Sequence, residues 1–321
     1  MKILYISPIK TTIRLGDSNH FLEIGENLQK FGNELLIICR GREEDFKGLN
    51  IKFIPNIEIK FFATIISEFF LTLYLIFHLL SFKPDVIYYR GVTLAGIISK
   101  IFEIPSVAEA NGIYPDEIRI ERPRFFKLTG WIFKLRERVL YFLATRIICV
   151  TEGIKRELVK NYGVKNETCK VIPNGANIDL FKPMDKIECR RKLGINEDYF
   201  CLGFVGSFRP WVGIDTLIEA ISMTKEKGYD GVRCILVGDG GSLDHLKEIV
   251  NQHNLQEEII FAGDISYKEV VVFMNSFDVC LAPFRKERNV KIGLSPLKLY
   301  EYLACARPVI GSRLQGISEV V

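Results

Sequence analysis

Short apolar segments rich in β-branched residues alternate with longer segments of helical periodicity along nearly the whole chain. In the first half, we predict strands at residues 2–7, 35–39, 51–54, 86–89, 106–109, 146–150 and 170–172. Helices are predicted between them at residues 20–31, 61–81, 94–102, 125–144 and 152–162. Strands that alternate with helices form parallel sheets with right-handed crossovers and helices on both faces. The pattern therefore predicts a doubly wound α/β fold.

The turn-forming segment Pro-Asn-Gly-Ala-Asn-Ile-Asp at residues 173–179 divides this alternation into two series. After it, strands are predicted at residues 201–206, 233–237, 259–261, 279–281 and 309–310, and helices at 214–227, 243–253, 267–274 and 296–304. Ser266 and Glu269 have the spacing of a capping box, which marks the start of one of these helices. A chain of 321 residues is long enough for two ordinary domains. We therefore predict two Rossmann-like domains, residues 1–175 and 176–321, that face each other across a cleft.

The segment Gly-Leu-Ser-Pro-Leu-Lys-Leu-Tyr-Glu at residues 293–301 has the features of an anion site. Ser295 is a favoured N-cap and Pro296 a favoured first helical residue, so free N–H groups are expected at this point. Lys298 is unfavourable beside the positive end of a helix dipole unless an anion such as a diphosphate lies between them. Glu301, one turn further on, can accept hydrogen bonds from the two hydroxyls of a ribose. The alternative is a Lys298–Glu301 surface pair on an ordinary capped helix.

Two further loops of the second half follow predicted strands, where ligands of open α/β sheets bind. The glycine-rich loop at residues 237–242 leads into a helix, which favours phosphate, although a tight turn explains it equally well. In the loop at residues 204–213, Arg209 can bind a phosphate through two hydrogen bonds or can be a solvated side chain. Trp211 can cover a ligand or fill the edge of the core.

In the first half, the polar loop at residues 7–19 and the segment with Glu109 and Asn111 also follow predicted strands. Both can line a site, and both can be ordinary turns. The four histidines are scattered and no Gly-x-Ser-x-Gly segment occurs, so we expect neither a metal site nor a serine hydrolase. The eight cysteines lack Cys-x-x-Cys spacing, which indicates buried, reduced thiols in a cytoplasmic protein. A net charge of +4 is too small to indicate a nucleic-acid partner.

Two segments raise the question of membrane contact. Residues 61–80 include fifteen apolar residues, but Glu68 and His78 interrupt them, so we predict a packed helix and not a span. Residues 119–138 carry seven basic residues against two acidic ones, interleaved with aromatic residues. This second pattern suits an anionic lipid surface, and it equally suits a helix packed on its own sheet with solvated charges.

Several of these segments together resemble the family 4 retaining glycosyltransferases, which have the GT-B fold of two Rossmann-like domains. The resemblance rests on residues 150–155, 171–183, 204–211, 236–240 and 295–309 and covers nearly the whole chain. It implies that the C-terminal domain holds a UDP-, GDP- or ADP-sugar, that the N-terminal domain holds the acceptor, and that neither a cofactor nor a metal ion takes part. The implied catalytic residues are Lys298, Arg209 and Asn111. The implied donor-binding residues are Gly206, Ser207, Gly238, Gly240, Asp264, Ile265, Ser295, Pro296, Leu297 and Glu301, and the implied acceptor-binding residues are Gly16, Asp17 and Glu109.

The chain departs from the family pattern at several positions. Gly293 stands where the first acid of the family's two-glutamate motif is expected, and Asn111 stands where the family often has a histidine. The family's phosphate-binding Arg and Lys match Ser207 and Val212, which leaves Arg209 as the nearby substitute. Only twenty residues follow Glu301, so we expect a C-terminal truncation.

The resemblance implies transfer of a sugar to a glycan or lipid-linked acceptor in cell-surface polysaccharide or glycolipid synthesis. The protein would work in the cytoplasm or peripherally on the inner face of the membrane. A nucleotide-sugar epimerase of the same fold and an inactive sugar-nucleotide-binding partner subunit are the alternatives.

Overall fold

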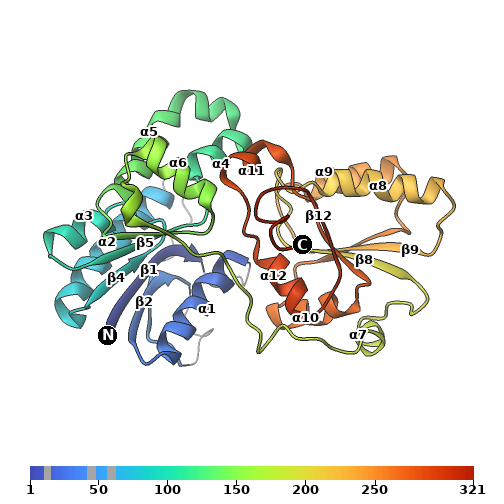
Figure 1. Ribbon diagram of the computed structural model, residues 1–321, viewed down its shortest axis with the longest axis horizontal. Helices are drawn as coiled ribbons and strands as arrows, with labels where there is room; N and C mark the ends of the chain where they lie inside the picture. Colours follow the sequence, from blue (N-terminus) through green and yellow to red (C-terminus); the bar gives the residue numbers. More distant parts are fainter. Residues whose placement is uncertain (11–15, 42–47, 56–62) are drawn as a thin grey trace. The chain divides into compact units, whose positions relative to one another are not determined.

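The computed structural model describes residues 1–10, 16–41, 48–55 and 63–321. The chain forms two compact units, Met1–Pro173 (unit 1) and Asn174–Val321 (unit 2). Each unit contains one parallel sheet with helices on its faces (Figure 1). The prediction of two doubly wound α/β domains is confirmed.

The described residues of unit 1 form seven parallel strands in the order β3-β2-β1-β4-β5-β6-β7. Their bounds are β1 (Lys2–Lys10), β2 (Glu34–Arg40), β3 (Ile51–Ile54), β4 (Val86–Tyr89), β5 (Ser106–Ala110), β6 (Arg146–Cys149) and β7 (Cys169–Val171). The helices are α1 (Gly16–Lys30), α2 (Ala63–Phe82), α3 (Ala95–Ile101), α4 (Tyr114–Glu121), α5 (Pro123–Phe142) and α6 (Glu152–Tyr162), with a 3₁₀ turn η2 (Asn166–Thr168). The strand order reverses between β1 and β4, which creates the position where such sheets bind ligands.

Local sequence sets the ends of α6. The Thr151 hydroxyl accepts a hydrogen bond from the backbone N–H of Ile154 at 3.0 Å, which caps the first turn. Gly163 ends the helix with φ = 74°, a left-handed conformation that glycine adopts at little cost. The helix predicted at residues 152–162 is therefore confirmed at both ends.

Helix α2 packs against β1 and β2 through one face only. Leu71, Leu75 and Leu79 recur every four residues and are buried, whereas Phe69 and Phe77 on the other side are exposed. No helix within the described residues is both long enough and apolar enough to cross a bilayer.

Unit 2 has five parallel strands in the order β10-β9-β8-β11-β12. Their bounds are β8 (Phe200–Val205), β9 (Val232–Val237), β10 (Ile259–Gly263), β11 (Val279–Ala282) and β12 (Val309–Gly311). The helices are α7 (Lys186–Leu193), α8 (Ile214–Glu226), α9 (Leu243–Gln252), α10 (Tyr267–Ser276), α11 (Lys286–Ile292) and α12 (Leu297–Ala304). Side chains that alternate along β8 enter two separate cores, because Phe204 packs with one cluster and Val205 with the other.

The predicted capping box of α10 is confirmed, since Ser266 Oγ accepts the Glu269 N–H at 3.3 Å and Glu269 Oε2 accepts the Ser266 N–H at 3.1 Å. Three helices were not predicted: α4, α7 and α11. Each has seven or eight residues, too few for a clear helical period. All eight cysteines are buried free thiols, as predicted.

Candidate functional site

The predicted donor-binding residues of unit 2 come together at the carboxyl ends of its strands. Four segments contribute them. Three are the loops that join β8 to α8, β9 to α9 and β10 to α10, and the fourth is the segment between α11 and α12. Because the strands are parallel, these loops share one edge of the sheet. The residues concerned are Gly206, Ser207, Gly238, Gly240, Asp264, Ile265, Ser295, Pro296, Leu297 and Glu301.

The glycines of this edge allow the loops to approach one another. Gly238 has φ = 127°, and a Cβ atom there would collide with the carbonyl oxygen of Gly206. A Cβ atom on Gly240 would lie 2.6 Å from the carbonyl oxygen of Phe208. Backbone hydrogen bonds join the same loops, from Gly206 N to Val237 O at 2.9 Å and from Phe208 N to Asp239 O at 2.9 Å. The glycine pattern is thus explained by loop packing before any ligand is considered.

Lys298 lies in the first turn of α12 and is enclosed by apolar groups. Its Nζ atom lies 3.7 Å from the centre of the Phe204 ring and 5.6 Å from that of Phe284. Gly206 has φ = 135°, and a Cβ atom there would come within 2.5 Å of Nζ, so a larger residue would displace the end of the lysine side chain. Within the described part of the chain, the ammonium forms neither a hydrogen bond nor an ion pair. Although the residue as a whole is partly exposed, desolvation of the ammonium lowers the pKa of Lys298 to about 7, and the charge of Glu301 offsets only part of this shift.

Ser295 does not act as the N-cap, which corrects the prediction. The helix begins at Leu297 with Pro296 in the N-cap position, and no side chain caps it. Ser295 Oγ instead accepts a hydrogen bond from Asn174 N at 2.8 Å, and Ser295 O accepts one from Asn174 Nδ2 at 2.6 Å. These bonds tie the first residue of unit 2 to the segment before α12, a link over 121 residues that no local pattern reveals.

Glu301 is buried, at 9% exposure, one turn after Lys298. The next residue, Tyr302, is wholly buried, and its hydroxyl accepts the N–H of Val205 at 2.8 Å near the end of β8. Helix α12 is thereby fixed against the sheet, which holds Lys298 and Glu301 at its edge.

Gly293 ends α11 with φ = 69° and ψ = −175°. Side chains other than glycine are disfavoured in this conformation. The backbone here therefore accounts for a glycine where the family resemblance leads one to expect an acid.

Two other predicted residues, Arg209 and Asp264, are exposed. Arg209 is exposed, with its guanidinium 5.8 Å from the Trp211 ring. Asp264 is exposed after β10, whereas Ile265 packs against the core.

In unit 1, the predicted Glu109 is the centre of a buried polar network. Its Oε1 atom lies 2.6 Å from His20 Nε2 and accepts a hydrogen bond from Asn111 Nδ2 at 2.6 Å. Its Oε2 atom accepts the Tyr88 hydroxyl at 2.7 Å. Burial alone would raise the pKa of Glu109, but the hydrogen bond and charge of His20, the charge of Arg90 and the Tyr88 hydroxyl lower it to about 2.

These contacts change the expected role of Glu109. Its exposure is 2%, and both carboxylate oxygens are engaged, so it holds other side chains in place and does not face a ligand directly. His20 and Asn111 are the more accessible members. His20 and Tyr88 were missed from the sequence, because residues 20 and 109 belong to different elements and share no motif spacing. The predicted Gly16 and Asp17 begin α1, one turn before His20.

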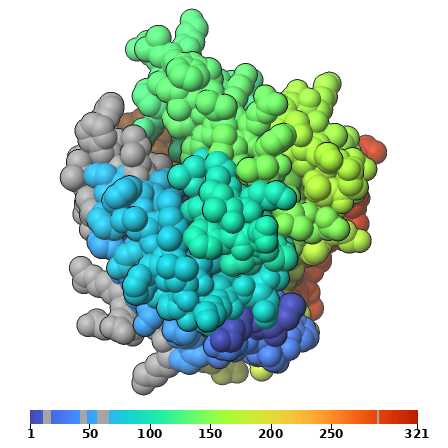
Figure 2. All heavy atoms as spheres, turned by 90° about the vertical axis from the view of Figure 1, so that its left-hand side faces the viewer, coloured from blue at the N-terminus to red at the C-terminus, as the bar shows by residue number. Residues whose placement is uncertain are grey.

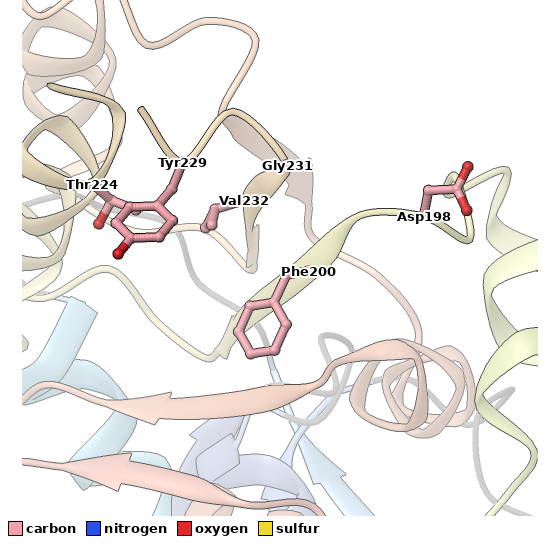
Figure 3. Close-up of a pocket in the computed structure, with 6 residues that line it drawn as sticks. All are labelled: Asp198, Phe200, Thr224, Tyr229, Gly231 and Val232. Carbon is pink, nitrogen blue, oxygen red and sulfur yellow. The ribbon is translucent and has the colours of Figure 1, made fainter. Parts of the chain in front are cut away.

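The hollow shown in Figure 3 lies elsewhere in unit 2. It has a volume of about 510 Å³ and is lined by Asp198, Phe200, Thr224, Tyr229, Gly231 and Val232. Phe200 and Val232 are the first residues of β8 and β9, so this hollow lies at the amino ends of the strands. Sheets of this kind bind ligands at the opposite ends. Among the described residues, no group of three His, Cys, Asp or Glu is arranged to hold a metal ion.

Two family models match the chain. Residues 16–180 match the model described as Glycosyltransferase Family 4, and residues 185–321 match the model described as Glycosyl transferases group 1. A D-inositol 3-phosphate glycosyltransferase from Acidothermus cellulolyticus is 28% identical over 239 residues, which cover 72% of this chain and 49% of that protein. The chain thus spans about half the length of this relative.

Solved structures share the fold. The Anabaena HepE protein in complex with UDP has a TM-score of 0.71 at 21% identity, covering 100% of this chain and 83% of that one. WaaG, a glycosyltransferase involved in lipopolysaccharide biosynthesis, has a TM-score of 0.77 at 18% identity, covering 98% of this chain and 82% of that one.

Proposed function

This chain belongs to glycosyltransferase family 4, and from that premise we propose that it transfers a sugar from a nucleotide-diphosphate sugar to a glycan or lipid-linked acceptor. We further propose that the transfer retains the configuration of the sugar and needs no metal ion. The observation that carries the proposal is the pair Lys298 and Glu301, held one turn apart at the carboxyl edge of the unit 2 sheet.

A diphosphate explains the surroundings of Lys298. Its ammonium lies between aromatic rings and forms no ion pair within the described residues. A charge that has lost water and gained no partner is costly, and a diphosphate would supply the missing anion. The N–H groups at the start of α12 add donors on the same side. Glu301, one turn further on, is placed to accept the ribose hydroxyls of the same nucleotide.

The chemistry then needs no protein nucleophile. The bond between the anomeric carbon and the diphosphate oxygen breaks, and the acceptor oxygen bonds to the same face of the sugar. The acceptor proton passes to the departing diphosphate. Lys298, Arg209 and the helix N–H groups stabilise the negative charge that develops on this leaving group.

The comparisons guide the choice of substrates. HepE is seen with UDP, so a UDP-sugar is the first donor to test. WaaG is involved in lipopolysaccharide biosynthesis, which supports a lipid-linked acceptor and a place in cell-envelope synthesis. In unit 1, His20 and Asn111 are the groups best placed to meet an acceptor hydroxyl, because Glu109 orients both.

Binding of UDP tests the donor site. We expect Glu301→Ala and Lys298→Ala each to weaken UDP binding by about tenfold or more in calorimetry, since each loses a hydrogen bond to the nucleotide. Lys268→Ala is the matched control, because Lys268 is the second residue of α10 just as Lys298 is the second residue of α12. Unchanged UDP affinity in both site variants would exclude this site.

Gly293 favours a second candidate function. With no acid at this position, the site can bind a nucleotide sugar without transferring it, as an inactive partner subunit would. Incubation of the full-length protein with labelled UDP-glucose and candidate acceptors separates the two functions. Binding without any labelled product supports the partner subunit, and labelled product supports the transferase.

A further inference from the structure

Helix α5 presents an apolar surface that none of the described residues of unit 1 covers. Leu128, Trp131, Ile132 and Leu135 follow one another at helical spacing, and Leu128 and Trp131 are 79% and 67% exposed. The opposite side of the same helix is buried, including Gly130, Glu137, Leu140 and Tyr141. The exposed residues therefore form a second apolar face, in addition to the face that packs on the domain.

Helix α2 has the same organisation. Phe69, Leu73, Phe77 and Leu80 are exposed along one side, and Phe77 is 67% exposed. The buried leucines of α2 lie on the other side and pack toward the sheet.

An ion pair links the two helices, and α3 contacts both of them. Glu68 of α2 accepts a hydrogen bond from Arg136 of α5 at 2.5 Å, and the Thr93 hydroxyl and backbone N–H also donate to Glu68. Figure 2 shows both helices on one side of unit 1, with α5 (green) above α2 (light blue). We call the exposed apolar residues of α2 and α5, namely Phe69, Leu73, Phe77, Leu80, Leu128, Trp131, Ile132 and Leu135, the apolar face.

Exposed basic residues accompany the apolar face along α5 and the segment before it. They are Arg119, Arg122, Arg124, Lys127, Lys134 and Arg138. Arg119 pairs with Asp116 at 3.4 Å, and Glu121 is exposed. Glu137 is buried, so the exposed side chains of this segment keep an excess of positive charge. Exposed tryptophan and leucine with flanking basic side chains are typical of helices that lie in the surface of an anionic bilayer.

We propose that the apolar face of α2 and α5 docks on the surface of an anionic lipid bilayer, with the basic residues of α5 against the lipid headgroups. A protein partner of such a surface would be expected to bring acidic side chains to meet the same basic residues. The bilayer is favoured because the large apolar side chains are spread over two helices and lie beside positive charge. The inference does not depend on the proposed transfer reaction.

Vesicle flotation of the full chain tests the docking. We expect binding to phosphatidylcholine vesicles that contain phosphatidylglycerol, and much weaker binding to phosphatidylcholine alone. Leu128→Glu/Trp131→Glu should reduce binding at least about tenfold, because two apolar side chains that would enter the bilayer are replaced by charged ones. Leu73→Glu/Phe77→Glu, on α2, should also reduce vesicle binding at least about tenfold. Lys127→Gln/Lys134→Gln should reduce binding about 25-fold at low salt, at about fivefold for each charge.

Phe31→Glu is the control, because Phe31 is 84% exposed but lies at the end of α1 and not on the apolar face. Urea denaturation of the α5 variants, monitored by circular dichroism, shows whether unit 1 keeps its fold. Unchanged UDP affinity in these variants separates this test from that of the donor site in unit 2. The fluorescence of Trp131, one of two tryptophans, should shift to shorter wavelength on addition of anionic vesicles, and Trp131→Phe should abolish the shift. Absence of vesicle binding, or equal binding by wild type and the α5 and α2 variants, would overturn the proposal.

Discussion

The two units treat a buried charge at the carboxyl edge of their sheets in opposite ways. In unit 1, the Glu109 carboxylate is surrounded by His20, Asn111 and Tyr88. In unit 2, the Lys298 ammonium lies against aromatic rings without an ion pair among the described residues. The first charge is satisfied by the fold itself, whereas the second is left for something else to satisfy. The difference indicates that Glu109 serves the structure of its site and Lys298 serves binding.

Glu109→Ala tests whether Glu109 stabilises the fold, and it should have the largest effect on stability of the variants proposed here. We expect a loss of about 3–5 kcal/mol in the free energy of unfolding, because the substitution leaves the buried Tyr88 hydroxyl without its acceptor and removes the partner of His20 and Asn111. Urea denaturation, monitored by circular dichroism, measures this loss of stability. Glu34→Ala is the control, because Glu34 is exposed and lies in the same unit. Because the folded-state pKa is lowered to about 2, the wild-type advantage should be full above about pH 4.5 and disappear as the pH falls toward 2. A loss no larger than that of the control would show that the network contributes little to stability.

Much of this organisation could be predicted from the sequence. The alternation of strands and helices fixes two parallel sheets, and in parallel sheets the strand ends must meet at one edge. Lys298 and Glu301 could be placed there because strand, loop and helix are contiguous. The Glu109–His20 pair could not be predicted, because it joins residues 89 apart through tertiary packing alone. The same reason explains why Ser295 was predicted as a cap, when its actual partner is Asn174.

Gly238→Ala asks whether the loops of unit 2 are shaped by the fold or by the ligand. We expect a loss of about 2–3 kcal/mol in stability without any ligand, since a Cβ atom at φ = 127° would collide with the Gly206 carbonyl. Gly241→Ala is the control, because nothing lies near a Cβ atom at that position. Thermal and urea unfolding of the ligand-free protein measure both variants. Equal stability of the two would show that the glycine at 238 is not needed for loop packing.

Lys298→Met tests whether Lys298 serves ligand binding and not the stability of the fold. Among the described residues, the Lys298 ammonium has an aromatic contact with Phe204 but no ion pair, so its removal should leave the free energy of unfolding unchanged or slightly higher, in contrast to Glu109→Ala. The affinity for UDP should fall by about ten- to a hundredfold, because a charge-assisted hydrogen bond to the diphosphate is lost. Calorimetry and urea denaturation of the same preparation measure the two effects, with Lys268→Met as the matched control. A large loss of stability with normal UDP affinity would reverse the roles assigned to the two charges.

The pH dependence of UDP binding tests whether the Lys298 side chain gains its charge only when a diphosphate is bound. In the free protein, desolvation lowers the pKa of Lys298 to about 7, so the side chain is largely neutral above that pH. A bound diphosphate favours the charged form, which raises the pKa in the complex. Binding must therefore take up a proton above pH 7, and UDP affinity should fall by up to about tenfold for each pH unit between about 7 and 9.

Lys298→Arg is the control, because a guanidinium stays charged throughout this range and should give a flat profile over the same interval. Calorimetry in buffers of different ionisation enthalpy measures the proton uptake directly. An affinity in the wild type that is constant from pH 7 to 9 would mean that Lys298 is already charged in the empty site, and that the fold satisfies it as fully as it satisfies Glu109.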